Sequence, residues 1–123
     1  MTEKRRTILI VDDEPDMCWA LEELLKRMGF PTARAESGQK ALGLAGRIPF
    51  RCAFVDAKLP DVEGIELVSH LRQLQPDLLV VLISGYFYEE DSQVQEWMKD
   101  GAIHRFISKP FLFEKVYQVL RET

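Results

Sequence analysis

The feature that most constrains the fold of this chain is a regular alternation of short apolar runs with longer segments of helical periodicity. The runs cover residues 8–11, 32–35, 52–55, 78–83 and 105–107, and the second and last are weaker than the others. Consecutive apolar residues of this kind are typical of parallel strands that are buried on both faces of a sheet. Their alternation with helical segments predicts an α/β fold around one parallel sheet.

The segments between and after the runs carry apolar residues at the spacing of amphipathic helices. They cover residues 17–28, 38–45, 65–74, 89–99 and 113–120. Ser37 is a candidate N-cap of the second helix, and Gly29 and Gly101 are candidates to end the first and the fourth. Five strands alternating with five helices predict a single domain over residues 1–123, built as a three-layer (βα)5 sandwich with a five-stranded parallel sheet.

Charge, hydropathy and cysteine content argue against several classes of protein. The net charge is −4 and the basic residues are scattered, so we expect no direct binding of nucleic acid, which requires basic patches. No apolar run approaches the roughly 20 residues that cross a bilayer, and the N-terminus lacks the apolar stretch of a secretory signal. Cys18 and Cys52 are predicted to be reduced thiols of a cytoplasmic protein.

Polar residues follow four of the five predicted strands, at the points where the strands end. Asp12 and Asp13 follow the first strand, Asp56 the third, Ser84 the fourth and Lys109 the fifth. Because right-handed crossovers place the carboxyl ends of parallel strands at one edge, we expect these side chains to converge there. Taken singly, an Asp after a strand is usually a helix N-cap and a Lys before Pro a solvated loop residue, but five coincidences favour a site.

Three converging carboxylates would repel one another unless a cation lay among them. Mg²⁺ suits a few carboxylates together with water and phosphate oxygens, while Lys109 adds a second positive charge and Ser84 a hydroxyl donor. This combination is typical of phosphoryl transfer, in which a carboxylate can itself act as the nucleophile.

Four segments resemble the signature segments of response-regulator receiver domains, in the family's order and spacing. They are residues 8–14 (ILIVDDE), 55–64 (VDAKLPDVEG), 83–85 (ISG) and 106–111 (FISKPF). The resemblance covers essentially the whole chain. It implies a flavodoxin-like fold and a signalling role rather than an enzyme, beyond self-phosphorylation and self-dephosphorylation.

The resemblance also implies a role for each residue of the expected metal site. Asp56 and Asp13 would bind Mg²⁺ through their side chains, and Asp12 would do so mostly through water. Lys58 would contribute its backbone carbonyl to the same ion.

Further roles follow from the resemblance for the phosphoryl group and the switch. Asp56 would accept the phosphoryl group from a sensor histidine kinase or a histidine phosphotransfer protein. Lys109 would pair with the phosphoryl oxygens, and Ser84 would hydrogen-bond one of them. Phe106 stands at the family's switch position, where we expect it to swing inward unless it is plain core. The peptide bond before Pro110 is usually cis in the family.

Partner surfaces are expected at two places. The first helix is predicted to face the core with Met17, Leu21, Leu24 and Met28. Trp19 would then lie on the opposite side, with Pro15 and Cys18 on the same flank, as candidates for docking the phosphoryl donor. The face formed by residues 89–99, 105–107 and 113–120 is the expected switch surface for partner binding or a homodimer.

Other functions fit the residues less well. An aspartate-nucleophile phosphohydrolase of the haloacid dehalogenase type needs a D-x-D pair, but Asp12 and Asp13 are adjacent and Asp56 is followed by Ala57. A flavodoxin-like cofactor binder would need a Gly/Ser/Thr-rich phosphate cradle in place of acids. A degenerate receiver that acts only as a protein-binding module is the remaining alternative. The aromatic run 86–88 could reshape the output face or simply pack.

Overall fold

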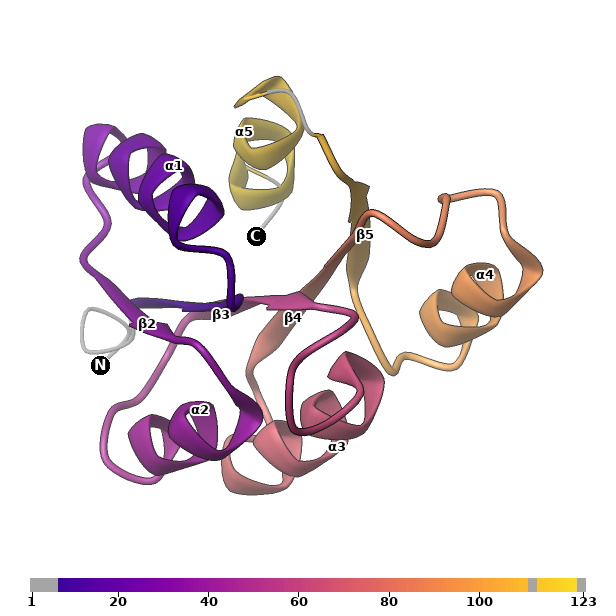
Figure 1. Ribbon diagram of the computed structural model, residues 1–123, viewed down its shortest axis with the longest axis horizontal. Coiled ribbons are helices and arrows are strands. Elements are labelled where there is room, and N and C mark those ends of the chain that lie inside the picture. The colour runs from indigo at the N-terminus through magenta and orange to yellow at the C-terminus, as the bar shows by residue number, and fades with distance from the viewer. Residues whose placement is uncertain (1–6, 111–112, 122–123) are drawn as a thin grey trace.

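The computed structural model describes residues 7–110 and 113–121, and within them strands and helices alternate as the sequence predicts. The strands are β1 (Ile8–Val11), β2 (Thr32–Ala35), β3 (Cys52–Asp56), β4 (Leu79–Ser84) and β5 (Arg105–Ser108). The helices are α1 (Pro15–Arg27), α2 (Gly38–Ala45), α3 (Gly64–Leu74), α4 (Ser92–Lys99) and α5 (Phe113–Arg121). All neighbouring strands pair in parallel in the order β2-β1-β3-β4-β5, which confirms the predicted fold class (Figure 1).

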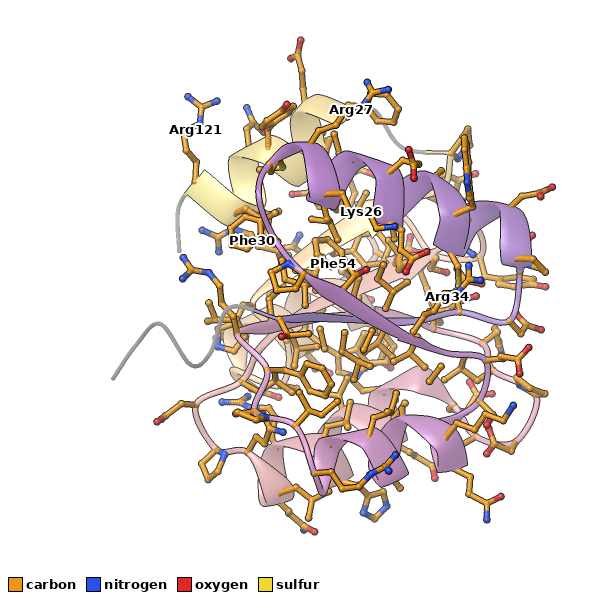
Figure 2. The ribbon with its side chains drawn as sticks, turned by 90° about the vertical axis from the view of Figure 1, so that its left-hand side faces the viewer. Lys26, Arg27, Phe30, Arg34, Phe54 and Arg121 are labelled. Atoms are coloured by element: carbon orange, nitrogen blue, oxygen red, sulfur yellow. The ribbon has the colours of Figure 1, made fainter. Side chains whose placement is uncertain are left out.

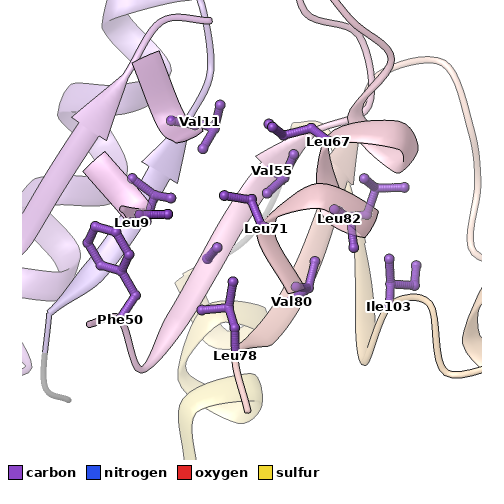
Figure 3. Close-up of a cluster of buried hydrophobic side chains, with 14 of the residues drawn as sticks. Leu9, Val11, Phe50, Val55, Leu67, Leu71, Leu78, Val80, Leu82 and Ile103 are labelled. Carbon is purple, nitrogen blue, oxygen red and sulfur yellow. The ribbon is translucent and has the colours of Figure 1, made fainter. Parts of the chain in front are cut away.

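Two apolar layers enclose the sheet because successive residues of each strand point to opposite faces. Leu9 and Val11 of β1 belong to the layer that packs against α2 and α3, and Val94 of α4 joins its edge. Ile8 and Ile10 belong to the layer under α1 and α5. Figure 3 shows the first layer, with strand residues facing those of α3, and Figure 2 shows Phe54 in the second layer.

The inward face of α1 differs from the predicted one. Cys18, Leu21, Leu24 and Leu25 are buried, whereas Met17 and Met28 are only partly buried. The helix begins at Pro15, which supplies a fixed φ at the first turn, and Cys18 Sγ donates a hydrogen bond to the carbonyl of Asp12 (3.2 Å). The apolar stripe is therefore rotated toward Cys18.

Helix α4 is also shorter than predicted at its N-terminal end. The helix begins at Ser92 rather than at residue 89, because the side chain of Asp91 accepts a hydrogen bond from Tyr88 N (2.9 Å) and closes a turn first. Two glycines just beyond helix ends adopt a positive φ, as helix-terminating glycines do. Gly101 follows α4 with a φ of 79°, and Gly29 follows α1 with a φ of 89°.

Within the described part of the chain, no helix is both long enough and apolar enough to cross a membrane.

Candidate functional site

The five predicted site residues meet at the carboxyl edge of the sheet. Asp56 and Ser84 are the last residues of β3 and β4, while Asp12 and Lys109 directly follow β1 and β5. The backbone fixes these ends to one another, since Ala57 N donates to the carbonyl of Ile83 (2.8 Å) and Lys109 N donates to that of Ser84 (2.8 Å). The predicted convergence is thus present.

Three carboxylates form the acidic part of the site. One oxygen from each of Asp12, Asp13 and Asp56 lies within 4.8 Å of the others. Asp12 and Asp56 are buried, with 1% and 5% of their surface exposed, whereas Asp13 is open to solvent. Asp12 Oδ1 accepts a hydrogen bond from Glu14 N (2.9 Å), so the same residue also orders the turn into α1.

Lys109 is the cation that holds this acidic cluster together in the described structure. Its Nζ lies 2.9 Å from Asp12 Oδ2, 3.1 Å from Asp56 Oδ2 and 2.7 Å from Glu14 Oε1. Burial by itself would lower the pKa of Lys109, but the bonds to Glu14 and Asp12 and the nearby Asp56 charge outweigh it and raise the pKa. The ammonium is therefore firmly charged.

Asp56 experiences opposing influences on its charge. Burial, together with the negative charge of Asp12, raises the pKa of Asp56 above its ordinary value. The Lys109 ion pair and the hydrogen bond from Lys58 N (3.3 Å) oppose that rise. One ammonium among several carboxylates leaves excess negative charge, which a further cation would relieve.

The donor set fits a hard divalent cation. Asp12 Oδ2 is buried, and apart from the Lys109 ion pair it accepts no well-aligned hydrogen bond from the described residues. Oxygen ligands of this kind suit Mg²⁺, which binds few carboxylates and keeps several waters. An open cavity of about 680 Å³ lies above Asp13 and Asp56 and extends to Lys58, Tyr86 and Lys109, leaving room for water and a phosphoryl group.

Ser84 is buried, and its hydroxyl organises the loop that follows β4. Ser84 Oγ accepts hydrogen bonds from Tyr86 N (2.8 Å) and Phe87 N (3.1 Å). The Phe87 ring packs edge-to-face on Trp97 of α4, with 5.4 Å between centroids. Tyr86 and Tyr88 are exposed. In the aromatic run 86–88, then, the middle residue packs and its two neighbours face solvent.

The loop after β3 places Lys58 beside the cavity. Its ammonium pairs with Glu63 (3.2 Å) and lies 6.0 Å from the centre of the Tyr86 ring. A role for its backbone carbonyl as a metal ligand stays a prediction.

Phe106 and Pro110 lie beside the site on the β5 side. Phe106 is only 6% exposed and belongs to the layer shared with α3 and α4, so its side chain is already inward. An inward swing therefore cannot start from this conformation, and the switch role stays a prediction. The Lys109–Pro110 peptide bond is cis, as the resemblance implies. Phe111, the last residue of that signature segment, lies outside the described residues.

One of the three docking candidates on α1 is wrong. Trp19 is 62% exposed and Pro15 is also exposed, but Cys18 is buried in the layer under α1. Cys18 precedes Trp19 by one residue, a rotation of about 100° around the helix, and this brings it to the inward face. Burial raises the pKa of its thiol to about 11, so the thiol stays protonated at neutral pH.

Two acidic residues contribute contacts that the sequence did not single out. Glu14 reaches Lys109, and Asp61 accepts hydrogen bonds from the first turn of α2. In the sequence, only the position of Glu14 directly after Asp12 and Asp13 could have pointed to its contact with Lys109. No local pattern predicts the contacts of Asp61, because its partners are more than 20 positions away in the chain.

Comparisons with known proteins identify similar sequences over nearly the whole chain. A family model described as the response regulator receiver domain matches residues 8–121. The response regulator protein PilR of Pseudomonas aeruginosa is 39% identical over 106 residues, which cover 86% of this chain and 23% of PilR. Sporulation initiation phosphotransferase F of Bacillus subtilis is 28% identical over 115 residues, which cover 94% of this chain and 90% of that protein.

Solved structures share the fold. A response regulator protein from Burkholderia pseudomallei, with a phosphorylated aspartic acid, a calcium ion and citrate, has a TM-score of 0.81 and 26% identity, covering 91% of this chain and 64% of that one. The response regulator TrrA of Thermotoga maritima, in complex with Mg²⁺–BeF, has a TM-score of 0.80 and 24% identity, covering 95% and 97%. The chain spans about a quarter of several curated relatives, 23% of PilR and 28% of a cyclic di-GMP phosphodiesterase of Thermotoga maritima.

Proposed function

Because this chain belongs to the response regulator receiver domain family, we propose that it accepts a phosphoryl group on Asp56 in a Mg²⁺-dependent reaction. The donor would be a sensor histidine kinase or a histidine phosphotransfer protein. The observation that carries the proposal is the convergence of Asp12, Asp13 and Asp56 within 4.8 Å, with the Lys109 ammonium on two of them. The B. pseudomallei relative with its phosphorylated aspartic acid supports the same chemistry.

Asp56 would act as the nucleophile. One of its carboxylate oxygens attacks the phosphorus atom, the bond from phosphorus to the donor's imidazole nitrogen breaks, and an acyl phosphate forms. Lys109 keeps the carboxylate ionised and stands where it can pair with the incoming phosphoryl oxygens. Because Lys109 already contacts Asp56, no large movement of the cation is required.

Asp12, Asp13, Asp56 and the backbone carbonyl of Lys58 would hold the metal ion. When bound, Mg²⁺ neutralises charge on the phosphoryl oxygens and the carboxylates. The Mg²⁺–BeF complex of TrrA supports Mg²⁺ as the ion. Outside the transfer of its own phosphoryl group, we propose no enzymatic activity for this chain.

Ser84 would pass the phosphorylation state to α4. A phosphoryl oxygen on Asp56 attracts the Ser84 hydroxyl, which now accepts hydrogen bonds from Tyr86 N and Phe87 N. If Ser84 moves, the Phe87 backbone loses its acceptor, and the contact between Phe87 and Trp97 carries the shift to α4. A change in the position of Phe106, which is already inward, would accompany that shift.

We propose protein partners at two surfaces. The exposed Trp19 and Pro15 on α1 would dock the phosphoryl donor, and the α4–β5–α5 face would bind an output partner or a second copy. We propose a cytoplasmic location and no direct contact with nucleic acid. We propose no output activity for the whole protein, because several relatives are about four times as long as this chain.

Intact mass spectrometry tests the central proposal. The chain is incubated with acetyl phosphate and Mg²⁺, beside the Asp56→Ala variant and an EDTA control. A phosphoryl-sized gain in mass that both controls abolish is expected. If no gain appears, beryllofluoride binding shows whether a short-lived acyl phosphate escaped detection, and failure of both assays favours a protein-binding module without phosphoryl transfer.

A further inference from the structure

The loop between β3 and α3, residues 57–63, carries the Lys58 carbonyl of the proposed metal site and closes on itself. Gly64 N donates to the carbonyl of Ala57 (2.8 Å), and Leu59 N donates to that of Val62 (3.3 Å). Lys58 and Glu63 pair as an isolated antiparallel bridge. These bonds shape the loop, but none of them attaches it to β2 or α2 on the far side of β1.

The Asp61 side chain makes that attachment. Asp61 Oδ1 accepts a hydrogen bond from Gly38 N (2.8 Å), and Asp61 Oδ2 accepts one from Gln39 N (3.0 Å). These two N–H groups open α2 and have no acceptor inside the helix. The bonds lower the pKa of Asp61, so the side chain is ionised at neutral pH.

Ser37 caps the next N–H groups of the same helix. Its Oγ accepts from Lys40 N (3.2 Å), and its carbonyl accepts from Ala41 N (3.1 Å). Asp61 and Ser37 thus together accept the hydrogen bonds of the backbone N–H groups in the first turn of α2. Ser37 does so from within its own segment, whereas Asp61 does so from a loop on the other side of the site.

The first turn of α2 is in turn attached to the strand that carries Asp12. Asp12 N donates a hydrogen bond to the carbonyl of Ala35 at the end of β2 (3.1 Å), and α2 begins three residues later. Gly38 also lies against the loop so closely that a Cβ there would come 2.5 Å from Val62 Cγ1. The chain of contacts runs from Asp12 through Ala35 and Gly38 to Asp61.

We propose that Asp61 is a positioning residue that holds the β3–α3 loop, and with it the Lys58 carbonyl, in place beside the carboxylates of the metal site. Pairing of β1 with β3, with Val11 beside Val55, already fixes Asp12, Asp13 and Asp56 relative to one another, so Asp61 acts on the loop that carries the Lys58 carbonyl. This inference rests on the proposed function and deepens it. Residues that orient metal ligands without touching the ion typically change affinity 10–100-fold when they are removed.

The test compares Asp61→Ala and Asp61→Asn with Ser37→Ala, a control that weakens the same helix cap without touching the loop. Mg²⁺ affinity is measured by calorimetry, phosphorylation rate by intact mass with acetyl phosphate, and loop freedom by amide hydrogen exchange over residues 57–63. For Asp61→Ala we expect an increase of about tenfold in the Mg²⁺ Kd, slower phosphorylation and faster exchange in the loop. Asp61→Asn, whose Oδ1 can still accept one bond, falls in between.

Ser37→Ala is expected to lower thermal stability while leaving the Mg²⁺ Kd and exchange in residues 57–63 unchanged. The positioning role is overturned if Asp61→Ala loses stability as Ser37→Ala does and keeps the Mg²⁺ Kd of the unmodified chain. An unmodified chain that neither binds Mg²⁺ nor gains a phosphoryl group would instead overturn the proposed function, and the role of Asp61 with it.

Discussion

Gly64 lies directly against the backbone carbonyl of Asp56. A Cβ at position 64 would overlap with that carbonyl oxygen and approach Ala57 Cα to 2.8 Å. The contact lies between two backbones, so no flexible side chain can move aside to relieve it. The first turn of α3 can therefore approach the end of β3 only with glycine at this position.

Gly64→Ala is expected to lower both stability and phosphorylation. The overlap displaces the backbone on which Asp56 is carried and costs about 1–3 kcal/mol of unfolding free energy. Urea denaturation measures the loss, and intact mass with acetyl phosphate measures the rate. Gly43→Ala in α2 is the matched control. A Cβ added there would have nothing within 4 Å, so this variant should gain about 0.5–1 kcal/mol of unfolding free energy. Equal stability of the two variants would contradict the close approach.

Mg²⁺ is expected to stabilise the folded chain, because the three carboxylates converge only after folding. A free concentration 100 times the Kd adds about 2.7 kcal/mol to the unfolding free energy. Asp13→Asn removes one exposed carboxylate of the three and should abolish most of this gain in a thermal melt. Asp16→Asn makes the same charge change in the exposed first turn of α1 and should keep the gain. A gain that survives in Asp13→Asn would place the ion elsewhere.

Stability should fall in mild acid because of His104. Its Nδ1 accepts a hydrogen bond from Val80 N (3.0 Å), and burial together with the charge of Arg72 lowers its pKa below 6.5. The unfolded chain therefore takes up a proton near pH 6.5, where the folded chain does not. The contribution is fully present above pH 6.5 and is lost as the pH falls toward the lower folded pKa, with a slope of at most about 1.4 kcal/mol per pH unit.

His104→Asn should flatten that slope, since the amide oxygen can accept from Val80 N without titrating. His70→Asn on the exposed face of α3 should leave the slope as it is. Urea midpoints between pH 7.5 and 5 measure both, and an unchanged slope in His104→Asn would assign the acid sensitivity to another group.

Trp97 should report phosphorylation through Phe87. In a Trp19→Phe background Trp97 is the sole tryptophan of the chain, so its emission follows the α4 side alone. Beryllofluoride with Mg²⁺ should change that emission, and Ser84→Ala should remove most of the change because the hydroxyl links the site to Phe87 N. Tyr88→Phe, at an exposed position, is the control. A full response in Ser84→Ala would mean that the signal bypasses the hydroxyl.

Much of the fold and the main part of the site could be predicted from the sequence. Strand and helix periodicities are local, so all five strands and five helices were expected close to where they lie. Parallel strands must end at one edge, so the residues after them, Asp12, Asp56, Ser84 and Lys109, could be placed together without coordinates.

Features that depend on distant contacts came only from the tertiary structure. The burial of Cys18 follows from the rotation of α1 on the sheet, and the inward position of Phe106 follows from how β5 packs against α3 and α4. The Glu14–Lys109 ion pair and the Asp61 cap join residues 95 and more than 20 positions apart. Periodicity determines which face of an element is apolar, but the choice of partner for a polar side chain requires that the elements already be packed together.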